Sequence, residues 1–177
     1  MNIINISTEF GDMGITGGLA KATYSLSLAL KKKGHDIQVI VPSYQKTKHV
    51  LQISGIPVHQ ILLKRVIAEH LYPSYGVCIT NYKIVDAYFY PFSSVNPDRS
   101  ALEAMLEFNQ LAHRKIIELK EQGWIADLVI LNDWQTGMCA QWLNDIKTLL
   151  IIHNASYIGF DPYYFRDAER GNWLKNL

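Results

Sequence analysis

Three short segments of this sequence carry residue types that can bind a sugar or a phosphate group. Adjacent glycines stand at Gly17 and Gly18 in "GITGGLAK", and a carboxylate stands at Asp133 in "NDWQTG". An imidazole stands beside an amide at His153 and Asn154 in "LLIIHNAS". Paired glycines let a diphosphate approach the backbone without obstruction by Cβ, and a helix that begins there offers unpaired N–H groups to an anion. A carboxylate beside an aromatic ring can hydrogen-bond the hydroxyls of a sugar.

Each segment also has an ordinary structural interpretation, and the residues alone leave both open. Gly17 and Gly18 can form a tight strand-to-helix turn that needs a positive φ. Asn132 or Asp133 can cap a short helix with Trp134 in the core, because Asn and Asp are preferred N-caps. A histidine at the end of a buried strand is commonly satisfied by hydrogen bonds within the fold.

The residues around these segments predict strands that alternate with helices. Short β-branched or apolar runs predict strands, and apolar residues at spacings of three and four predict helices. The predicted strands are 2–8, 36–42, 127–132 and 148–154, with two to four more in the irregular stretch 50–92. The predicted helices are one that begins after Gly18 and one at 98–122. This order predicts an α/β fold, a Rossmann-like doubly wound and mainly parallel sheet with helices on both faces.

The predicted sheet places all three segments at one edge. Ligands of an open parallel sheet bind outside the carboxyl ends of its strands. Glu9 follows the carboxyl end of the first predicted strand, 2–8, although a glutamate there is ordinarily an exposed loop residue. Strands 127–132 and 148–154 lack alternation and are expected to be buried. The first helix is expected to bury the apolar residues that share one face, Leu19, Ala22, Leu26, Ala29 and Leu30.

Composition excludes several classes of protein. The chain has 177 residues, of which 49% are hydrophobic and 19% charged, as in an ordinary globular domain. A net charge of +1 gives no reason to expect nucleic acid or a membrane surface as partner. The apolar runs are too short to span a bilayer, and the start lacks a secretory signal pattern. Cys78 and Cys139 lie far apart without CxxC spacing, so we expect no metal site and a cytoplasmic location.

In this order and spacing, the segments resemble the N-terminal catalytic domain of bacterial glycogen synthases and plant starch synthases, glycosyltransferase family 5. The resemblance rests on "STEFGDMGITGGLAKATYSLSLALKKKGHDIQVIVPSY", "LVILNDWQTGM" and "LLIIHNASYIGF", and it extends to "GNWLKNL". It covers both ends of the chain well and the middle poorly. It implies the N-terminal half of a GT-B fold, in which two Rossmann-like domains enclose an active cleft.

The resemblance also implies an activity and a set of site residues. The activity is retaining transfer of glucose from ADP-glucose or UDP-glucose to an α-1,4-glucan in glycogen biosynthesis, without a metal or another cofactor. Asp133 and His153 are expected to be catalytic, positioning the glucosyl group and stabilising positive charge at its anomeric carbon. The residues expected to bind substrate are Glu9, Gly17, Gly18, Lys21 and Asn154.

Two positions depart from "KTGGLADV", the usual family pattern. Ile15 stands where the family carries lysine, which removes a cation that would meet a phosphate or sugar. Lys21 stands where the family carries aspartate, and an ammonium in the first turn of a helix costs about 0.3 kcal/mol or more unless an anion lies nearby. We therefore expect Lys21 either to face the anion in place of the missing lysine or to mark a decayed site.

The length of the chain limits what it can do alone. The family's nucleotide-binding C-terminal domain follows the N-terminal one, and 177 residues cannot hold both. The resemblance thus predicts one incomplete domain, 1–177, that is inactive in glucosyl transfer by itself and self-associates through an open apolar edge. Two other interpretations stay open: a degenerate, non-catalytic module that binds glucan or a protein, and a GT-B transferase with a different sugar acceptor.

Overall fold

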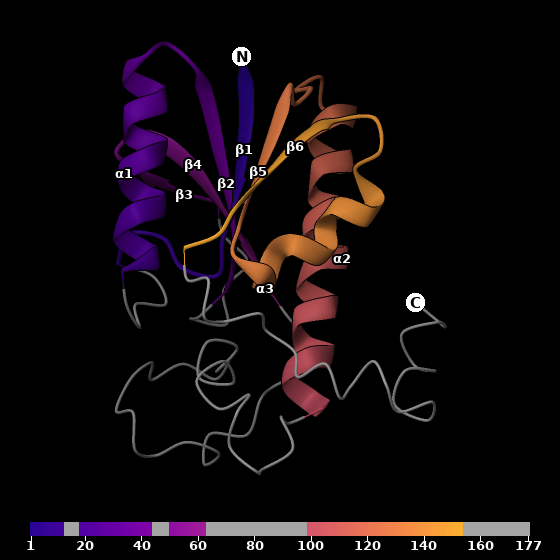
Figure 1. The fold of residues 1–177 in the computed structure, drawn as a ribbon. Helices are drawn as coiled ribbons and strands as arrows, with labels where there is room; N and C mark the ends of the chain where they lie inside the picture. Colours follow the sequence, from indigo (N-terminus) through magenta and orange to yellow (C-terminus); the bar gives the residue numbers. More distant parts are fainter. Residues whose placement is uncertain (13–17, 44–49, 63–98, 154–177) are drawn as a thin grey trace.

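A six-stranded sheet forms the centre of the part of the protein that the computed structural model describes, residues 1–12, 18–43, 50–62 and 99–153 (Figure 1). The strands are β1 (Asn2–Ile6), β2 (Asp36–Pro42), β3 (Val50–Ile53), β4 (Ile56–Ile61), β5 (Leu128–Asn132) and β6 (Lys147–Ile151). Their order across the sheet is β3-β4-β2-β1-β5-β6. Every adjacent pair is parallel except the β3–β4 hairpin. The predicted mainly parallel α/β sheet is confirmed.

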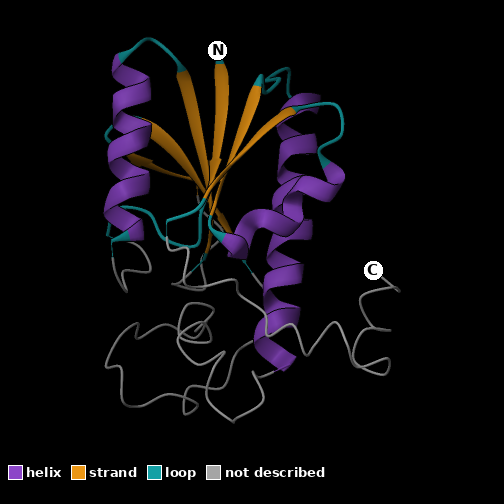
Figure 2. Cartoon of the chain, in the orientation of Figure 1, coloured by secondary structure: helices purple, strands orange, loops and turns teal. Residues whose placement is uncertain are grey.

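Helices cover both faces of the sheet (Figure 2). The helices are α1 (Leu19–Lys32), α2 (Arg99–Glu121) and the single turn α3 (Trp134–Gly137), which continues into the 3₁₀ helix η3 (Met138–Trp142). Successive strand residues point to opposite faces, so Ile3 packs in the core with α1 and Ile4 packs in the core with α2. This is the doubly wound arrangement that the sequence predicts. Among the helices described here, none is long and apolar enough to cross a membrane.

The predicted buried face of α1 is confirmed in part. Leu19 is buried, and Leu26 and Leu30 are partly buried against the core. Ala22 and Ala29 are exposed. The buried residues of the helix are Leu19, Ala20, Thr23 and Ser27. The cause lies in β1, where the fully buried Asn5 donates hydrogen bonds from Nδ2 to Ser27 Oγ at 2.8 Å and to the Thr23 carbonyl at 3.4 Å. The helix therefore turns Ser27 toward the sheet, because a buried amide must be paired, and the buried Thr23 hydroxyl bonds the Glu9 carbonyl.

Strand β6 is also less buried than predicted. Leu149 and Leu150 are 48% and 45% exposed. In the described part of the chain β6 pairs only with β5, so it stands at the edge of the sheet. A continuous apolar run is typical of a strand covered on both faces, and the described residues do not supply that cover.

The β3–β4 hairpin confirms part of the strand prediction in the irregular stretch, and 76–92 lies outside the described residues. Its two turn residues, Ser54 and Gly55, have φ angles of 52° and 72°, the left-handed geometry that suits a two-residue hairpin. Helix α1 holds the turn in place. Lys31 Nζ donates to the Gly55 carbonyl, and the Tyr24 hydroxyl lies 2.7 Å from Ser54 Oγ.

Candidate functional site at the carboxyl ends of the parallel strands

The loop after β1 places a buried carboxylate at the start of α1. Glu9 is only 2% exposed, so its interpretation as an exposed loop residue is wrong. Its Oε2 accepts the Ala20 N–H at 3.2 Å, and its backbone carbonyl accepts the Thr23 hydroxyl at 2.9 Å. The loop is also tied to the helix by the Gly11 N–H, which donates to the Ala20 carbonyl at 3.1 Å. A negative charge is stabilised at this end of a helix, so Glu9 occupies part of the anion site that α1 offers.

Asp133 follows β5 with a strained backbone. Its φ of 59° and ψ of 177° lie in a region that essentially only glycine adopts, at a cost of about 1–3 kcal/mol. The surrounding chain holds this geometry. The Asp133 N–H donates to the Ile151 carbonyl at 2.8 Å, and its own carbonyl accepts the Thr136 N–H at 3.3 Å. The residue stands at the N-cap position of α3 without a side-chain capping bond.

The Asp133 carboxylate instead reaches the residue after β6. Its Oδ1 accepts the backbone N–H of His153 at 2.8 Å. Asp133 therefore stands at the N-cap position as the capping interpretation says, but its carboxylate accepts the His153 N–H instead of capping α3. Trp134, which the same interpretation places in the core, is partly buried against the α2-side core.

The His153 ring is oriented by a buried asparagine. Its Nε2 lies 3.0 Å from Asn132 Oδ1. An amide oxygen only accepts, so Nε2 carries the proton and Nδ1 is the acceptor of the neutral ring. Asn132 Nδ2 in turn donates to the Ile6 carbonyl at 2.8 Å and to Asn5 Oδ1. The exposed imidazole is thus fixed by two fully buried amides on adjacent strands.

Sequence reasoning missed Asn5 and considered Asn132 only as a helix cap. The signal was present, since both asparagines interrupt apolar strand runs, "NIINI" and "LVILN". A buried amide is costly unless it is paired, so an asparagine inside a buried strand indicates a hydrogen-bond network. Here that network ends at His153.

Of the remaining predicted site residues, the structure describes only Gly18 and Lys21. Gly18 is the N-cap of α1 with φ −75° and ψ −16°, so the positive-φ interpretation is wrong for this glycine. Apart from adjacent backbone, no described atom lies within 4 Å of the position that a Cβ would take at Gly18. Lys21 is exposed in the first turns of α1. Gly17 and Asn154 lie outside the described residues, as does Ile15.

The described part of the chain contains no cluster of three or more His, Cys, Asp or Glu side chains that could hold a metal ion. Cys139 is a free, buried thiol, and burial raises its pKa to about 12. Only a thiolate is a strong nucleophile, so Cys139 does not act as one at neutral pH. The chemistry of this site therefore rests on Asp133, His153 and the loop that carries Glu9.

The sheet and its site define a class of protein. An open parallel sheet with helices on both faces, and polar groups at the carboxyl ends of its strands, is the Rossmann-like arrangement that binds nucleotides and their derivatives. A family model described as the starch synthase catalytic domain matches residues 2–175, and the chain belongs to this family. It is a glycogen/starch-synthase-like glycosyltransferase domain, which confirms the resemblance drawn from its three segments.

Relatives and solved structures agree with this assignment. The chain is 28% identical over 179 residues to the glycogen synthase of Trichodesmium erythraeum (strain IMS101), covering 98% of this chain and 37% of that protein. It is 29% identical over 198 residues to the glycogen synthase of Marinomonas sp. (strain MWYL1), covering 100% of this chain and 40% of that protein. The chain thus spans less than half the length of these two relatives.

The fold is similar to that of two solved glycosyltransferases. The catalytic domain of starch synthase IV from Arabidopsis thaliana, bound to ADP and acarbose, matches with a TM-score of 0.57 at 19% identity, over 96% of this chain and 39% of that one. Sucrose-phosphate synthase from Thermosynechococcus elongatus matches with a TM-score of 0.53 at 14% identity, over 99% of this chain and 40% of that one. At these identities the likeness supports the GT-B fold.

Proposed function

We propose that this domain takes part in retaining transfer of glucose from ADP-glucose or UDP-glucose to an α-1,4-glucan, in cytoplasmic glycogen biosynthesis. The observation that carries the proposal is the geometry of Asp133. Its backbone stays in a costly conformation while its carboxylate is bonded to the His153 N–H. Strain of this kind persists where the surrounding structure enforces it, and it is concentrated at active sites. Membership of the starch synthase catalytic domain family supports the same activity.

In this proposal Asp133 and His153 act by position and charge. Retaining glucosyl transfer develops positive charge at the anomeric carbon, and a fixed carboxylate stabilises such charge without reorganising during the reaction. Asp133 is fixed by its backbone bonds, and His153 is fixed through Asn132. Both residues would therefore hold the glucosyl group in one orientation.

Glu9 and the start of α1 would contact the sugar rather than the diphosphate. The Glu9 carboxylate already meets the Ala20 N–H there, and a second anion beside it would be repelled. Sugar hydroxyls can donate to that carboxylate. We propose that substrate is bound by Glu9, Gly17, Gly18, Lys21 and Asn154. The proposed reaction uses no metal or other cofactor. Most of the contacts to the diphosphate would come from a C-terminal domain. The 177-residue chain alone would then not transfer glucose.

The decisive experiment measures glucose incorporation into glycogen from radiolabelled ADP-glucose and UDP-glucose. The 177-residue chain should give none, and a longer protein that carries this sequence should be active. In that longer protein Asp133→Asn and His153→Ala should each lower kcat by about 100-fold or more. The exposed Asp145→Asn is the matched control and should leave kcat unchanged. Absence of transfer by the longer protein would remove the enzymatic proposal.

A second candidate function is a non-catalytic module that binds glucan or a partner protein. It is favoured by Lys21, an exposed ammonium in the first turns of α1 where the family carries aspartate. Co-sedimentation with glycogen, without binding of either nucleotide sugar by the longer protein, would support this function. Tight binding of another nucleotide sugar would instead indicate a transferase with a different substrate.

A further inference from the structure

The hydrogen bonds around Asn132 have a direction that the backbone sets. Asn132 is fully buried at the end of β5, and its Nδ2 donates to the Ile6 carbonyl at 2.8 Å. A backbone carbonyl only accepts, so the amide nitrogen of Asn132 faces Ile6 and its Oδ1 faces His153. That oxygen lies 3.0 Å from His153 Nε2. The orientation of one buried amide therefore decides which nitrogen of the His153 ring carries the proton.

Asn5 of β1 holds Asn132 in the same orientation. The second hydrogen on Nδ2 of Asn132 is donated to Asn5 Oδ1. The nitrogen of Asn5 in turn donates to the Thr23 carbonyl at 3.4 Å and to Ser27 Oγ at 2.8 Å. A rotated Asn132 amide would press its oxygen against two acceptors, the Ile6 carbonyl and Asn5 Oδ1. Because buried polar groups that lose their partners are unfavourable, the network has a single direction.

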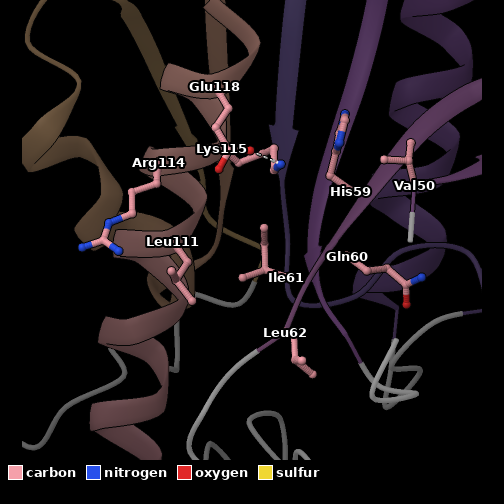
Figure 3. Close-up of a pocket in the computed structure, with 9 residues that line it drawn as sticks. All are labelled: Val50, His59, Gln60, Ile61, Leu62, Leu111, Arg114, Lys115 and Glu118. Atoms are coloured by element: carbon pink, nitrogen blue, oxygen red, sulfur yellow. Dashed lines mark hydrogen bonds and ion pairs between the residues drawn. The ribbon is translucent and has the colours of Figure 1, made fainter. Parts of the chain in front are cut away.

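His59 of β4 provides a comparison within the same sheet. It is only 8% exposed and lines a cavity of about 330 Å³ between α2 and β4 (Figure 3). Its Nε2 lies 2.5 Å from Gln38 Oε1, so this ring also carries its proton on Nε2. Its Nδ1 is buried, so a ligand cannot reach that atom. His153 is exposed instead, and the described residues bond its ring only through Nε2.

We propose that Asn132, held by Asn5, is a positioning residue that makes the neutral His153 ring present Nδ1 as an acceptor to a hydroxyl group of the substrate. This inference rests on the proposed glucosyl transfer, since His153 belongs to that site. A sugar hydroxyl can donate to Nδ1, whereas a fully ionised diphosphate has no proton to donate. The fixed ring therefore faces a sugar and not the diphosphate. Both asparagines are fully buried, so they act through His153 without touching the substrate.

The test observes the histidine ring nitrogens by ¹H–¹⁵N NMR on the whole 177-residue chain. The spectra are recorded at about pH 8, above the ordinary imidazole pKa of about 6.5, and His153→Gln identifies the signals of His153. The N–H proton of a free imidazole exchanges with water too fast to be seen directly, whereas a hydrogen bond to a buried acceptor slows that exchange. We expect a single tautomer with a visible Nε2 proton at His153. The buried His59 should give the same pattern in every variant and serves as the internal reference.

Variants of Asn132 separate positioning from general stability. Asn132→Leu removes the acceptor, so the Nε2 proton signal of His153 should disappear and both tautomers should be populated. Asn132→Asp keeps an oxygen opposite Nε2, so the single tautomer should persist. The control is Asn109→Leu, the same change at another fully buried asparagine, whose side chain bonds the Gln135 carbonyl and the Cys139 N–H. It should leave the His153 signals unchanged.

Thermal unfolding checks that each variant folds, and wild type with Asn132→Asp decides the question if Asn132→Leu does not. The proposal is overturned if wild-type His153 shows mixed tautomers or no Nε2 proton. It is also overturned if a folded Asn132→Leu keeps the wild-type His153 signals, or if a folded Asn132→Asp loses them.

Transfer activity is a separate readout, so this proposal and the proposed function can fail independently. In a longer protein that transfers glucose, Asn132→Leu should lower kcat by about fivefold or more, the value of one ordinary hydrogen bond, and Asn132→Asp should lower it less. Full kcat in a folded Asn132→Leu would overturn the positioning role. If the longer wild-type protein transfers no glucose, the proposed function fails, while the tautomer of His153 still tests the effect of Asn132 on the ring.

Discussion

The backbone conformation of Asp133 predicts that glycine at this position gives a more stable protein than alanine, the reverse of the usual order. The two variants Asp133→Ala and Asp133→Gly both lack the carboxylate and its 2.8 Å bond to the His153 N–H. Their difference in stability therefore isolates the backbone geometry. At most positions glycine is the less stable of the two by about 0.5–1 kcal/mol, because it loses more conformational freedom on folding.

At Asp133 the strain reverses this order. At φ 59° and ψ 177°, a residue with a Cβ carries about 1–3 kcal/mol of conformational strain that glycine does not have. Subtracting the entropic disadvantage of glycine from the middle of this range leaves Asp133→Gly more stable than Asp133→Ala by about 1 kcal/mol, and by at most about 2.5 kcal/mol. Relative to wild type, Asp133→Ala should lose about 1.5–3 kcal/mol, the usual worth of a hydrogen bond to a charged group. Asp133→Gly should recover much of that loss.

Urea unfolding followed by far-UV circular dichroism measures the difference directly. The control is Ala29→Gly on the exposed face of α1, which should cost about 1 kcal/mol in the ordinary direction. A finding that Asp133→Ala is as stable as Asp133→Gly, while Ala29→Gly behaves normally, would refute the strain and the functional argument built on it. In a longer protein with transfer activity, both Asp133 variants should lose that activity despite their different stabilities.

Three further predictions concern other parts of the fold. The pKa of His59 lies at about 4 in the folded chain, below its ordinary 6.5, so the unfolded state binds more protons between these values and the protein loses stability as the pH is lowered through them. From about pH 7 to about pH 4, urea unfolding should show wild type losing about 2 kcal/mol more than His59→Gln, since solvent near the ring screens part of the roughly 3 kcal/mol that the pKa shift represents. Equal losses would contradict this. Cys139 should resist alkylation by iodoacetamide in the folded chain and react only as the chain unfolds, because its thiol pKa is about 12; rapid modification under native conditions would show an accessible thiolate. The exposed apolar side chains of β6 and of Ile152 should make the 177-residue chain self-associate. Ile152→Lys should shift sedimentation toward the monomer. A wild type that sediments as a monomer would count against an open edge.

The sequence predicts the architecture well, because local patterns determine it. The β-branched runs of β1 and β2 and the helix between them require only short-range information, and the parallel pairing follows from their order. The carboxyl-edge placement of Asp133 and His153 follows in turn from the sheet, and the structure brings the two residues into direct contact. Their shared site was therefore predictable before any distance was known.

Other features depend on what packs against an element, and local pattern does not contain that information. The periodicity of α1 selects a face with Ala22 and Ala29, but the amide of Asn5 pairs with Ser27 and turns the helix toward its hydroxyl residues. The apolar run of β6 predicts a buried strand, whereas its place at the edge of the described sheet leaves it exposed. The strained φ of Asp133 is likewise imposed by bonds to other segments and has no local signature.

The buried polar residues of the strands differ in whether their hydrogen bonds are satisfied by the described residues. On β1 and β5, the hydrogen bonds of Asn5 and Asn132 join these two residues to each other, to Ser27 and to the His153 ring. A network satisfied in this way positions a side chain. On β4, by contrast, the paired Nε2 of His59 leaves Nδ1 as a buried acceptor without a described partner. Since an unpaired buried acceptor lowers stability, the arrangement at His59 costs free energy that the paired network of Asn5 and Asn132 does not cost.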